Sequence, residues 1–207
     1  EDNKKIYEGG FLDGLYSGKG TLYRDGLVYI EGDFLEGEPE GMIREFRDGR
    51  LYYAGEYRSG AYAGQGKLYY EDGETLRYAG GFSAGVYSGM GTEYYKSGAV
   101  KYKGGFSMGD YSGDGVEYYE NGAVKYQGGF SLGQYSGEGK LFSESGAARY
   151  IGGFAQGLYE GEGKLYDEAG TLLYEGSFLA GLYDGGGKLY VSGTEYIAGT
   201  FTKGTLS

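Results

Sequence analysis

One short segment returns along the whole chain. Residues 101–124 read KYKGGFSMGDYSGDGVEYYENGAV, and residues 125–148 read KYQGGFSLGQYSGEGKLFSESGAA. One glycine of this segment recurs at steps of 23 to 25 residues, at Gly9, Gly32, Gly55, Gly80, Gly104, Gly128, Gly152, Gly176 and Gly199. Because a single period fills the chain, the fold must consist of a small unit that stacks on copies of itself.

The composition favours an ordered array over a disordered chain. Glycine accounts for 47 of 207 residues, an excess that without a period would indicate disorder. However, the chain also holds 27 Tyr and 10 Phe, whose large rings suit pleated strands and are rare in disordered segments. No linker or charge block interrupts the repeat, so we expect residues 1–207 to form a single array.

Each repeat is predicted to be a β-hairpin. In the template, Tyr102, Gly104 and Phe106 alternate with Lys103 and Gly105, which is the period-2 pattern of a strand with two unlike faces. Residues 115–119 form the partner strand, and Asn121-Gly122 is a typical hairpin turn. The predicted fold class is therefore all-β, a single-layer antiparallel β-meander of eight to nine stacked hairpins. Seventeen strands at about 4.8 Å each would give an elongated ribbon about 80 Å long.

Aromatic residues form three columns across the repeats, and we expect them to stack in rows along the ribbon. The first-strand column is Phe11, Phe34, Tyr57, Phe82, Phe106, Phe130, Phe154, Phe178 and Phe201. The second-strand column is Tyr23, Phe46, Tyr69, Tyr94, Tyr118, Phe142, Tyr166 and Tyr190. The third column is predicted to lie in the turn between two glycines, at Tyr16, Tyr62, Tyr87, Tyr111, Tyr135, Tyr159 and Tyr183.

Two repeats depart from the pattern. In the second repeat, around residues 32–54, Pro39 stands at the position of the turn tyrosine and Ile43 replaces a glycine. Because proline lacks an N–H, Pro39 is expected to interrupt or bend the ribbon. The last repeat, residues 196–207, is partial and is expected to stop after one strand.

Charge and residue content exclude several classes of function. The net charge of −11 disfavours binding to nucleic acid, which depends on Lys and Arg. The chain has no Cys and no His, so disulfides, thiol nucleophiles and the commonest metal ligand are absent. We predict no metal site and no cofactor. The compartment stays open between cytoplasm, membrane surface and export, since residue 1 is Glu and a leader could have preceded it.

The pattern Tyr-x-Gly-x-Phe, x-x-Gly-x-Tyr-x-Gly-x-Gly, x-x-Tyr-x-x-x-Gly resembles the MORN repeat, the membrane occupation and recognition nexus. About eight full copies and a ninth partial copy cover the chain. The tyrosine-rich, cysteine-free repeats look more like those of bacterial members than like those of junctophilins. The resemblance implies an elongated, twisted β-sheet that serves as a scaffold: such arrays bind proteins, dimerise or lie near membranes.

We therefore predict a noncatalytic scaffold that binds a protein partner or a second copy of itself. The candidate contact residues are the tyrosines Tyr62, Tyr87, Tyr111, Tyr135, Tyr159 and Tyr183. No catalytic residue is predicted, because the recurring carboxylates Glu45, Glu93 and Glu117 are expected to be solvated surface positions rather than an acid–base pair.

Two alternative functions remain open at this point. Peripheral association with anionic phospholipid would use the basic residues Arg44, Arg47 and Arg50 of the irregular second repeat. Carbohydrate binding by an exported protein would use the tyrosine rings, whose faces can stack on sugars.

Overall fold

The computed structural model describes residues 4–207, and these residues form strands and turns without any helix. Contacts divide the chain into two compact units, residues 1–100 (unit 1) and residues 101–207 (unit 2). Each unit is described by itself. The predicted all-β fold class is confirmed.

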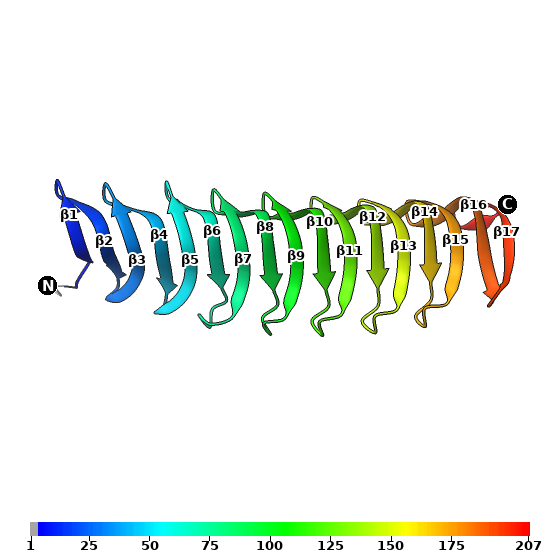
Figure 1. Cartoon of the computed structure of the whole chain (residues 1–207), viewed down its shortest axis with the longest axis horizontal. Coiled ribbons are helices and arrows are strands. Elements are labelled where there is room, and N and C mark those ends of the chain that lie inside the picture. The colour runs from blue at the N-terminus through cyan, green and yellow to red at the C-terminus, as the bar shows by residue number, and fades with distance from the viewer. Residues whose placement is uncertain (1–3) are drawn as a thin grey trace. The chain divides into compact units, whose positions relative to one another are not determined.

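Unit 1 is an antiparallel meander in which each strand pairs with the next along the chain (Figure 1). Its strands are β1 (Tyr7–Leu12), β2 (Leu15–Arg24), β3 (Leu27–Leu35), β4 (Glu38–Arg47), β5 (Arg50–Arg58), β6 (Ala61–Tyr69), β7 (Leu76–Ser83) and β8 (Val86–Tyr94).

Unit 2 repeats the same arrangement, with consecutive antiparallel pairs from β9–β10 to β17–β18. Its strands are β9 (Val100–Ser107), whose first residue closes unit 1, β10 (Asp110–Tyr118), β11 (Val124–Ser131), β12 (Gln134–Phe142), β13 (Ala148–Ala155), β14 (Leu158–Tyr166), β15 (Leu172–Leu179), β16 (Leu182–Ser192), β17 (Glu195–Thr202) and β18 (Thr205–Leu206).

The core of each unit is a row of tyrosines on one sheet face. These six core tyrosines lie in the first strand of their repeats and are 0% exposed: Tyr53, Tyr78, Tyr102, Tyr126, Tyr150 and Tyr174. The predicted phenylalanine row is buried with them from Phe82 to Phe201, and its rings meet the tyrosines edge to face at 5.0 to 5.4 Å. This geometry is the one that aromatic quadrupoles favour.

Each core tyrosine lies flat over glycine backbone. A Cβ atom on Gly187 would overlap the ring of Tyr174, and one on Gly176 would overlap the backbone of Gly187. The Tyr174 hydroxyl donates a hydrogen bond of 3.1 Å to the carbonyl oxygen of Ser177, so the buried polar end of the ring is satisfied. Gly176 and Gly187 are therefore required for close packing.

A bulge interrupts the regular register in every regular second strand. Between β9 and β10, the pairing moves from Tyr111 opposite Phe106 to Gly115 opposite Gly104. Gly113 lies inside the bulge with a φ of 69°, a left-handed conformation that a side chain disfavours. Gly113 is one of the two glycines that flank Tyr111 in the predicted turn, but it belongs to strand β10.

The tightest turns join the first strand to the second within each repeat. At Met108-Gly109 both residues have positive φ, 51° and 92°, as a two-residue type I′ turn requires. A hydrogen bond also joins several of these turns to the preceding hairpin. For example, the N–H of Gly133 in one turn donates to the carbonyl oxygen of Tyr111 in β10 at 3.1 Å. The predicted closing turn at Asn121-Gly122 is longer, and only its glycine has positive φ.

The second repeat does not interrupt the ribbon, which excludes one of the two effects expected of Pro39. Strand β4 contains Pro39 and pairs continuously with β3 and β5. Pro39 is buried opposite Phe34, in the place that a tyrosine takes in other repeats. Here the core tyrosine is replaced by Ile30, and Ile43 fills the space that its ring would need; both isoleucines are 3% exposed. The isoleucine pair thus replaces the tyrosine and its glycine floor together.

The last repeat also differs from its prediction. It contains a second strand, the short β18, so the described residues form 18 strands rather than 17. Leu206 of β18 pairs with Phe201, as a tyrosine does in the regular repeats, and it covers Gly199.

The core tyrosines make the fold sensitive to alkaline pH. Burial raises the pKa of Tyr78, Tyr102 and Tyr126 to about 12, against about 10 in an unfolded chain. Below pH 10 both states are protonated and stability is constant; between pH 10 and 12 only the unfolded state loses protons, so the free energy of unfolding must fall. Urea unfolding followed by circular dichroism from pH 8 to 12 measures this loss. A free energy that stays constant to pH 12 would contradict it.

Two adjacent glycines test the close packing. Gly187→Ala should destabilise unit 2 by about 1 to 3 kcal/mol, because its Cβ overlaps the Tyr174 ring. Gly186→Ala is the matched control: no atom lies within 4 Å of its Cβ position and its φ is not left-handed, so stability should stay within about 1 kcal/mol of wild type. Urea denaturation gives both values, and equal losses would refute the packing argument.

Candidate functional site

The structure places the predicted contact tyrosines in strands and not in turns. Each is the second residue of its strand and stacks face to face on a core tyrosine, with ring centroids 3.7 to 3.9 Å apart and planes 7 to 16° apart. These stacked tyrosines are Tyr62, Tyr87, Tyr111, Tyr135, Tyr159 and Tyr183, and all are half-buried. They therefore belong to the aromatic core and also contribute surface.

Local sequence explains this placement. The two-residue turn at Leu132-Gly133 brings Gln134 opposite Ser131 and Tyr135 opposite Phe130. Directly opposed residues of antiparallel strands share one sheet face. The Tyr135 ring is thus held between Phe130 and the core tyrosine Tyr126.

A hollow of about 340 Å³ opens beside the stacked tyrosines of unit 2. It collects equivalent positions from successive hairpins: Tyr111 and Tyr135, Gln134 and Leu158, and the turn glycines Gly133 and Gly157. Glu117, Lys125 and Gln156 complete its lining. The hollow therefore runs across hairpins, from β10 to β14, and is not confined to one repeat.

An ion pair lies at the floor of this hollow. Glu117 stands opposite the core tyrosines Tyr102 and Tyr126. Its Oε2 atom accepts a hydrogen bond of 2.6 Å from the Tyr135 hydroxyl, and its Oε1 atom lies 2.9 Å from Nζ of Lys125. Burial, and then the bond to Glu117, raise the pKa of Tyr135 far above its ordinary value. Because both carboxylate oxygens have partners, the group fixes a tyrosine rather than activating a substrate.

Unit 1 contains the same combination in its second repeat. Glu45 accepts a hydrogen bond of 2.7 Å from the Tyr62 hydroxyl and pairs with Nε of Arg47 at 3.1 Å. Glu45 is 5% exposed. The expectation that Glu45 and Glu117 are solvated surface positions was therefore wrong, because each meets a buried hydroxyl and a cation.

Other repeats carry leucine at this position. Leu141 stands opposite Tyr126 and Tyr150, as Glu117 stands opposite Tyr102 and Tyr126. Arg149 follows at the position of Lys125, but the buried Nη1 atom of Arg149 has no hydrogen-bond partner. The repeat thus keeps the cation and lacks the carboxylate.

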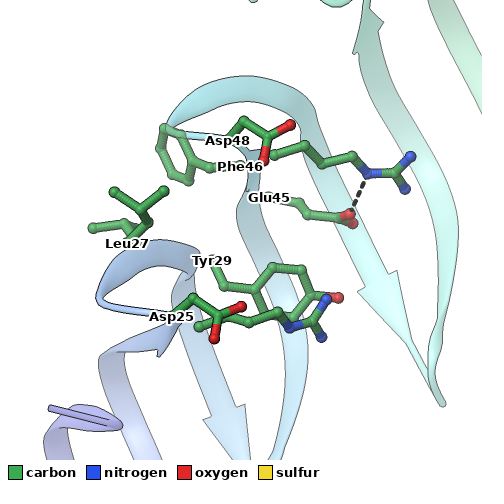
Figure 2. Close-up of a pocket in the computed structure, with 9 residues that line it drawn as sticks. Asp25, Leu27, Tyr29, Glu45, Phe46 and Asp48 are labelled. Atoms are coloured by element: carbon green, nitrogen blue, oxygen red, sulfur yellow. Dashed lines mark hydrogen bonds and ion pairs between the residues drawn. The ribbon is translucent and has the colours of Figure 1, made fainter. Parts of the chain in front are cut away.

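A second hollow, of about 400 Å³, lies in unit 1 between the β2–β3 and β4–β5 turns (Figure 2). The acidic side chains of Asp25 and Asp48 stand at its two turns, and Glu45 lies on the strand between them. The Arg24 guanidinium stacks 3.6 Å from the centre of the Tyr29 ring. The lining of this hollow carries both signs of charge and also includes the apolar residues Leu27, Val28 and Phe46.

The three candidate lipid-binding arginines do not converge. Arg44 pairs with Glu31 at 3.3 Å, whereas Arg47 pairs with Glu45 on the other sheet face. Arg50 donates a hydrogen bond of 3.2 Å to the carbonyl oxygen of Glu71. All three thus have acceptors within the protein.

Residues 4–207 contain neither a metal-binding cluster nor a candidate membrane-spanning helix. No group of three or more Asp or Glu side chains is arranged to hold a metal ion. No helix in this part of the chain is long and apolar enough to cross a membrane.

Sequence reasoning missed two features of the site. The sequence pattern placed the core tyrosines in strands but did not predict that they form the buried row. A signal was present, because the glycine two residues after each core tyrosine leaves space for a ring. The carboxylate column at Glu45, Glu93 and Glu117 alternates with leucine at the same repeat position, and this exchange with an apolar residue indicates burial.

The unpaired arginine generates a prediction. Leu141→Glu should place a carboxylate between Arg149 and the Tyr159 hydroxyl, and stability should stay constant or rise by about 1 kcal/mol. Leu165→Glu is the control: the residue at the cation position is Leu173, so the new carboxylate has no cation and should cost about 1 to 3 kcal/mol. Urea unfolding compares the variants, and similar losses for both would contradict the pairing.

Comparison with known proteins agrees with these observations. The family model of the MORN repeat matches residues 7–28, 53–75, 78–100, 102–124, 126–147, 150–171 and 174–195. The unmatched interval between the first two matches contains Ile30, Pro39 and Ile43, the residues that replace the regular core. No curated protein matches the chain. Since the seven matched segments cover most of the sequence, the chain belongs to the MORN repeat family.

Proposed function

We propose that this protein is a noncatalytic scaffold and that unit 2 presents its tyrosine-lined hollow to a protein partner. The observation that carries the proposal is the extent of the hollow, which gathers equivalent residues from successive hairpins. A ligand that fills it must be long enough to meet several repeats. An extended polypeptide segment meets this requirement.

The chemistry of the hollow supports a protein partner. Tyrosine provides a large rigid surface at low entropic cost and a hydroxyl for hydrogen bonding. The exposed part of Leu158, at 49% exposure, adds apolar contact at the rim. MORN repeats in general act in interactions with proteins or membranes.

The stacked tyrosines supply the proposed contact surface. Tyr111, Tyr135, Tyr159 and Tyr183 serve in unit 2, and Tyr62 and Tyr87 offer the same kind of surface in unit 1. Each ring also stacks on a core tyrosine, so removing it would change stability together with binding. Rim residues are therefore better probes of the interaction than the tyrosines themselves.

Membrane association has less support. The arginines that would bind an anionic headgroup, Arg44 and Arg47, pair with acids on opposite sheet faces. A polybasic lipid site needs several cations close together without compensating acids. Carbohydrate binding would use the tyrosine faces, but one face of each stacked tyrosine already covers a core tyrosine.

A pull-down with rim variants tests the proposal. The immobilised 207-residue chain is incubated with source-cell extract that includes membranes, washed at low and high salt, and read by mass spectrometry. A protein partner should stay bound at high salt to wild type and to the control Leu179→Asp. It should be lost from Leu158→Asp. The two leucines are 49% and 53% exposed, but only Leu158 lines the hollow.

Other results of the pull-down would change the conclusion. Recovery of anionic lipid alone, lost at high salt, would favour the membrane function. If Leu158→Asp retains a protein to the same degree as wild type, that protein contacts a surface outside the hollow. Retention of the chain itself would identify self-association as the interaction.

A further inference from the structure

The spacing of the stacked tyrosines restricts what conformation a bound segment can take. Tyr111 and Tyr135 line the same hollow and are separated by one hairpin, which is two strands. Neighbouring strands lie about 4.8 Å apart, so equivalent groups recur at about 9.6 Å. A bound chain that crosses the strands must offer an equivalent side chain at this interval.

A polyproline II helix fits this interval best among the regular conformations. It has three residues per turn and rises about 3.1 Å per residue, so residues i and i+3 lie on one side about 9.3 Å apart. An extended β-strand covers about 9.9 Å in three residues, but residues i and i+3 point to opposite sides. An α-helix brings residue i+7 back to the same side after about 10.5 Å. This rise is longer than the interval of about 9.6 Å, and the mismatch accumulates with every repeat.

The lining of the hollow also suits this conformation. A polyproline II backbone makes no internal hydrogen bonds, so its carbonyl groups are free to accept hydrogen bonds from a partner. The amide side chains of Gln134 and Gln156 lie in the lining and can donate. Half-buried Tyr111 and Tyr135 provide aromatic walls, the surface that proline-rich segments use in other recognition domains.

Charge indicates what accompanies the prolines. Residues 101–207 contain 13 acidic and 8 basic residues, a balance of −5. The carboxylate on the floor, Glu117, is already paired with Lys125. An apolar anchor therefore fits the hollow itself, and basic residues in the flanks fit the acidic surroundings.

We propose that unit 2 binds a proline-rich segment in the polyproline II conformation, with one residue in three seated beside successive stacked tyrosines and with basic flanking residues. The inference rests on the proposed scaffold function and specifies its partner. From β10 to β14 the hollow crosses two such intervals, or about 19 Å, which a polyproline II segment spans in about six residues.

Labelled peptides test the inference by fluorescence anisotropy with the full chain at constant salt. The first probe carries four Leu-Pro-Pro triplets between lysines, and the second has the same composition with its leucines out of the three-residue phase. A third probe is a proline-free amphipathic helix with lysine flanks. The triplet probe should bind at least about tenfold more tightly than the second, because each seated leucine contributes apolar burial. The affinity of the triplet probe should rise when the number of triplets in the peptide increases from two to four.

Matched variants locate the binding. Leu158→Asp should weaken the triplet probe about tenfold, whereas Leu179→Asp should leave it unchanged. Circular dichroism confirms that both variants fold, and Gln134→Ala replaces Leu158→Asp if the latter does not. Binding that responds to neither lining residue would overturn the inference.

The remaining outcomes separate the inference from the proposed function. Equal binding of the first two probes would refute the three-residue phase. Tighter binding of the helical probe, lost in Leu158→Asp, would refute the inference and leave the scaffold function standing. If no probe binds but the pull-down recovers a protein that Leu158→Asp loses, the inference is likewise refuted and the scaffold function stands. Absence of binding in both experiments would refute both.

Discussion

The structure depends on the contact between a tyrosine ring and bare backbone. In each regular repeat the core tyrosine lies over the glycines of its own strand and of the next, and the stacked tyrosine covers its other face. A single sheet has no second layer to exclude water from its strands. Two tyrosine layers over a glycine floor perform that task, and the hydroxyl of the inner ring is satisfied by a carbonyl three residues away. The high contents of glycine and of tyrosine therefore serve the same packing arrangement.

The second repeat shows that the residues of this packing arrangement are replaced together. Ile30 replaces the core tyrosine, Ile43 replaces a glycine of the floor, and Pro39 replaces the stacked tyrosine. The smaller isoleucine leaves the space that a floor residue with a side chain needs. A change at any one of these positions alone would leave either a cavity or an overlap.

The repeat predicted the fold class because its period leaves few ways to bury the aromatic residues. The hairpins, the phenylalanine row and the irregular second repeat all followed from fixed spacings such as those of Gly104 and Phe106. The role of Gly113 did not follow, since a glycine with positive φ has the same appearance in a turn and in a bulge. The burial of Glu45 was also missed, because its partners Tyr62 and Arg47 meet it only after the strands have paired. The stacked tyrosines were predicted to form a row along the ribbon, but their face-to-face contact with the core tyrosines was not predicted, since it too forms only after the strands have paired.

Pairing between consecutive strands has a consequence for how the chain acquires its structure. Within each unit, the strand pairs of residues 4–207 join strands that are neighbours in the sequence, and the hydroxyl of the core tyrosine donates a hydrogen bond to a carbonyl only three residues onward. Little loop entropy is lost before a contact forms, so contact order is low. A hairpin leaving the ribosome needs only the hairpin that follows it to close its aromatic stack. Synthesis can therefore lengthen an already folded array one repeat at a time, without waiting for a distant segment of the chain.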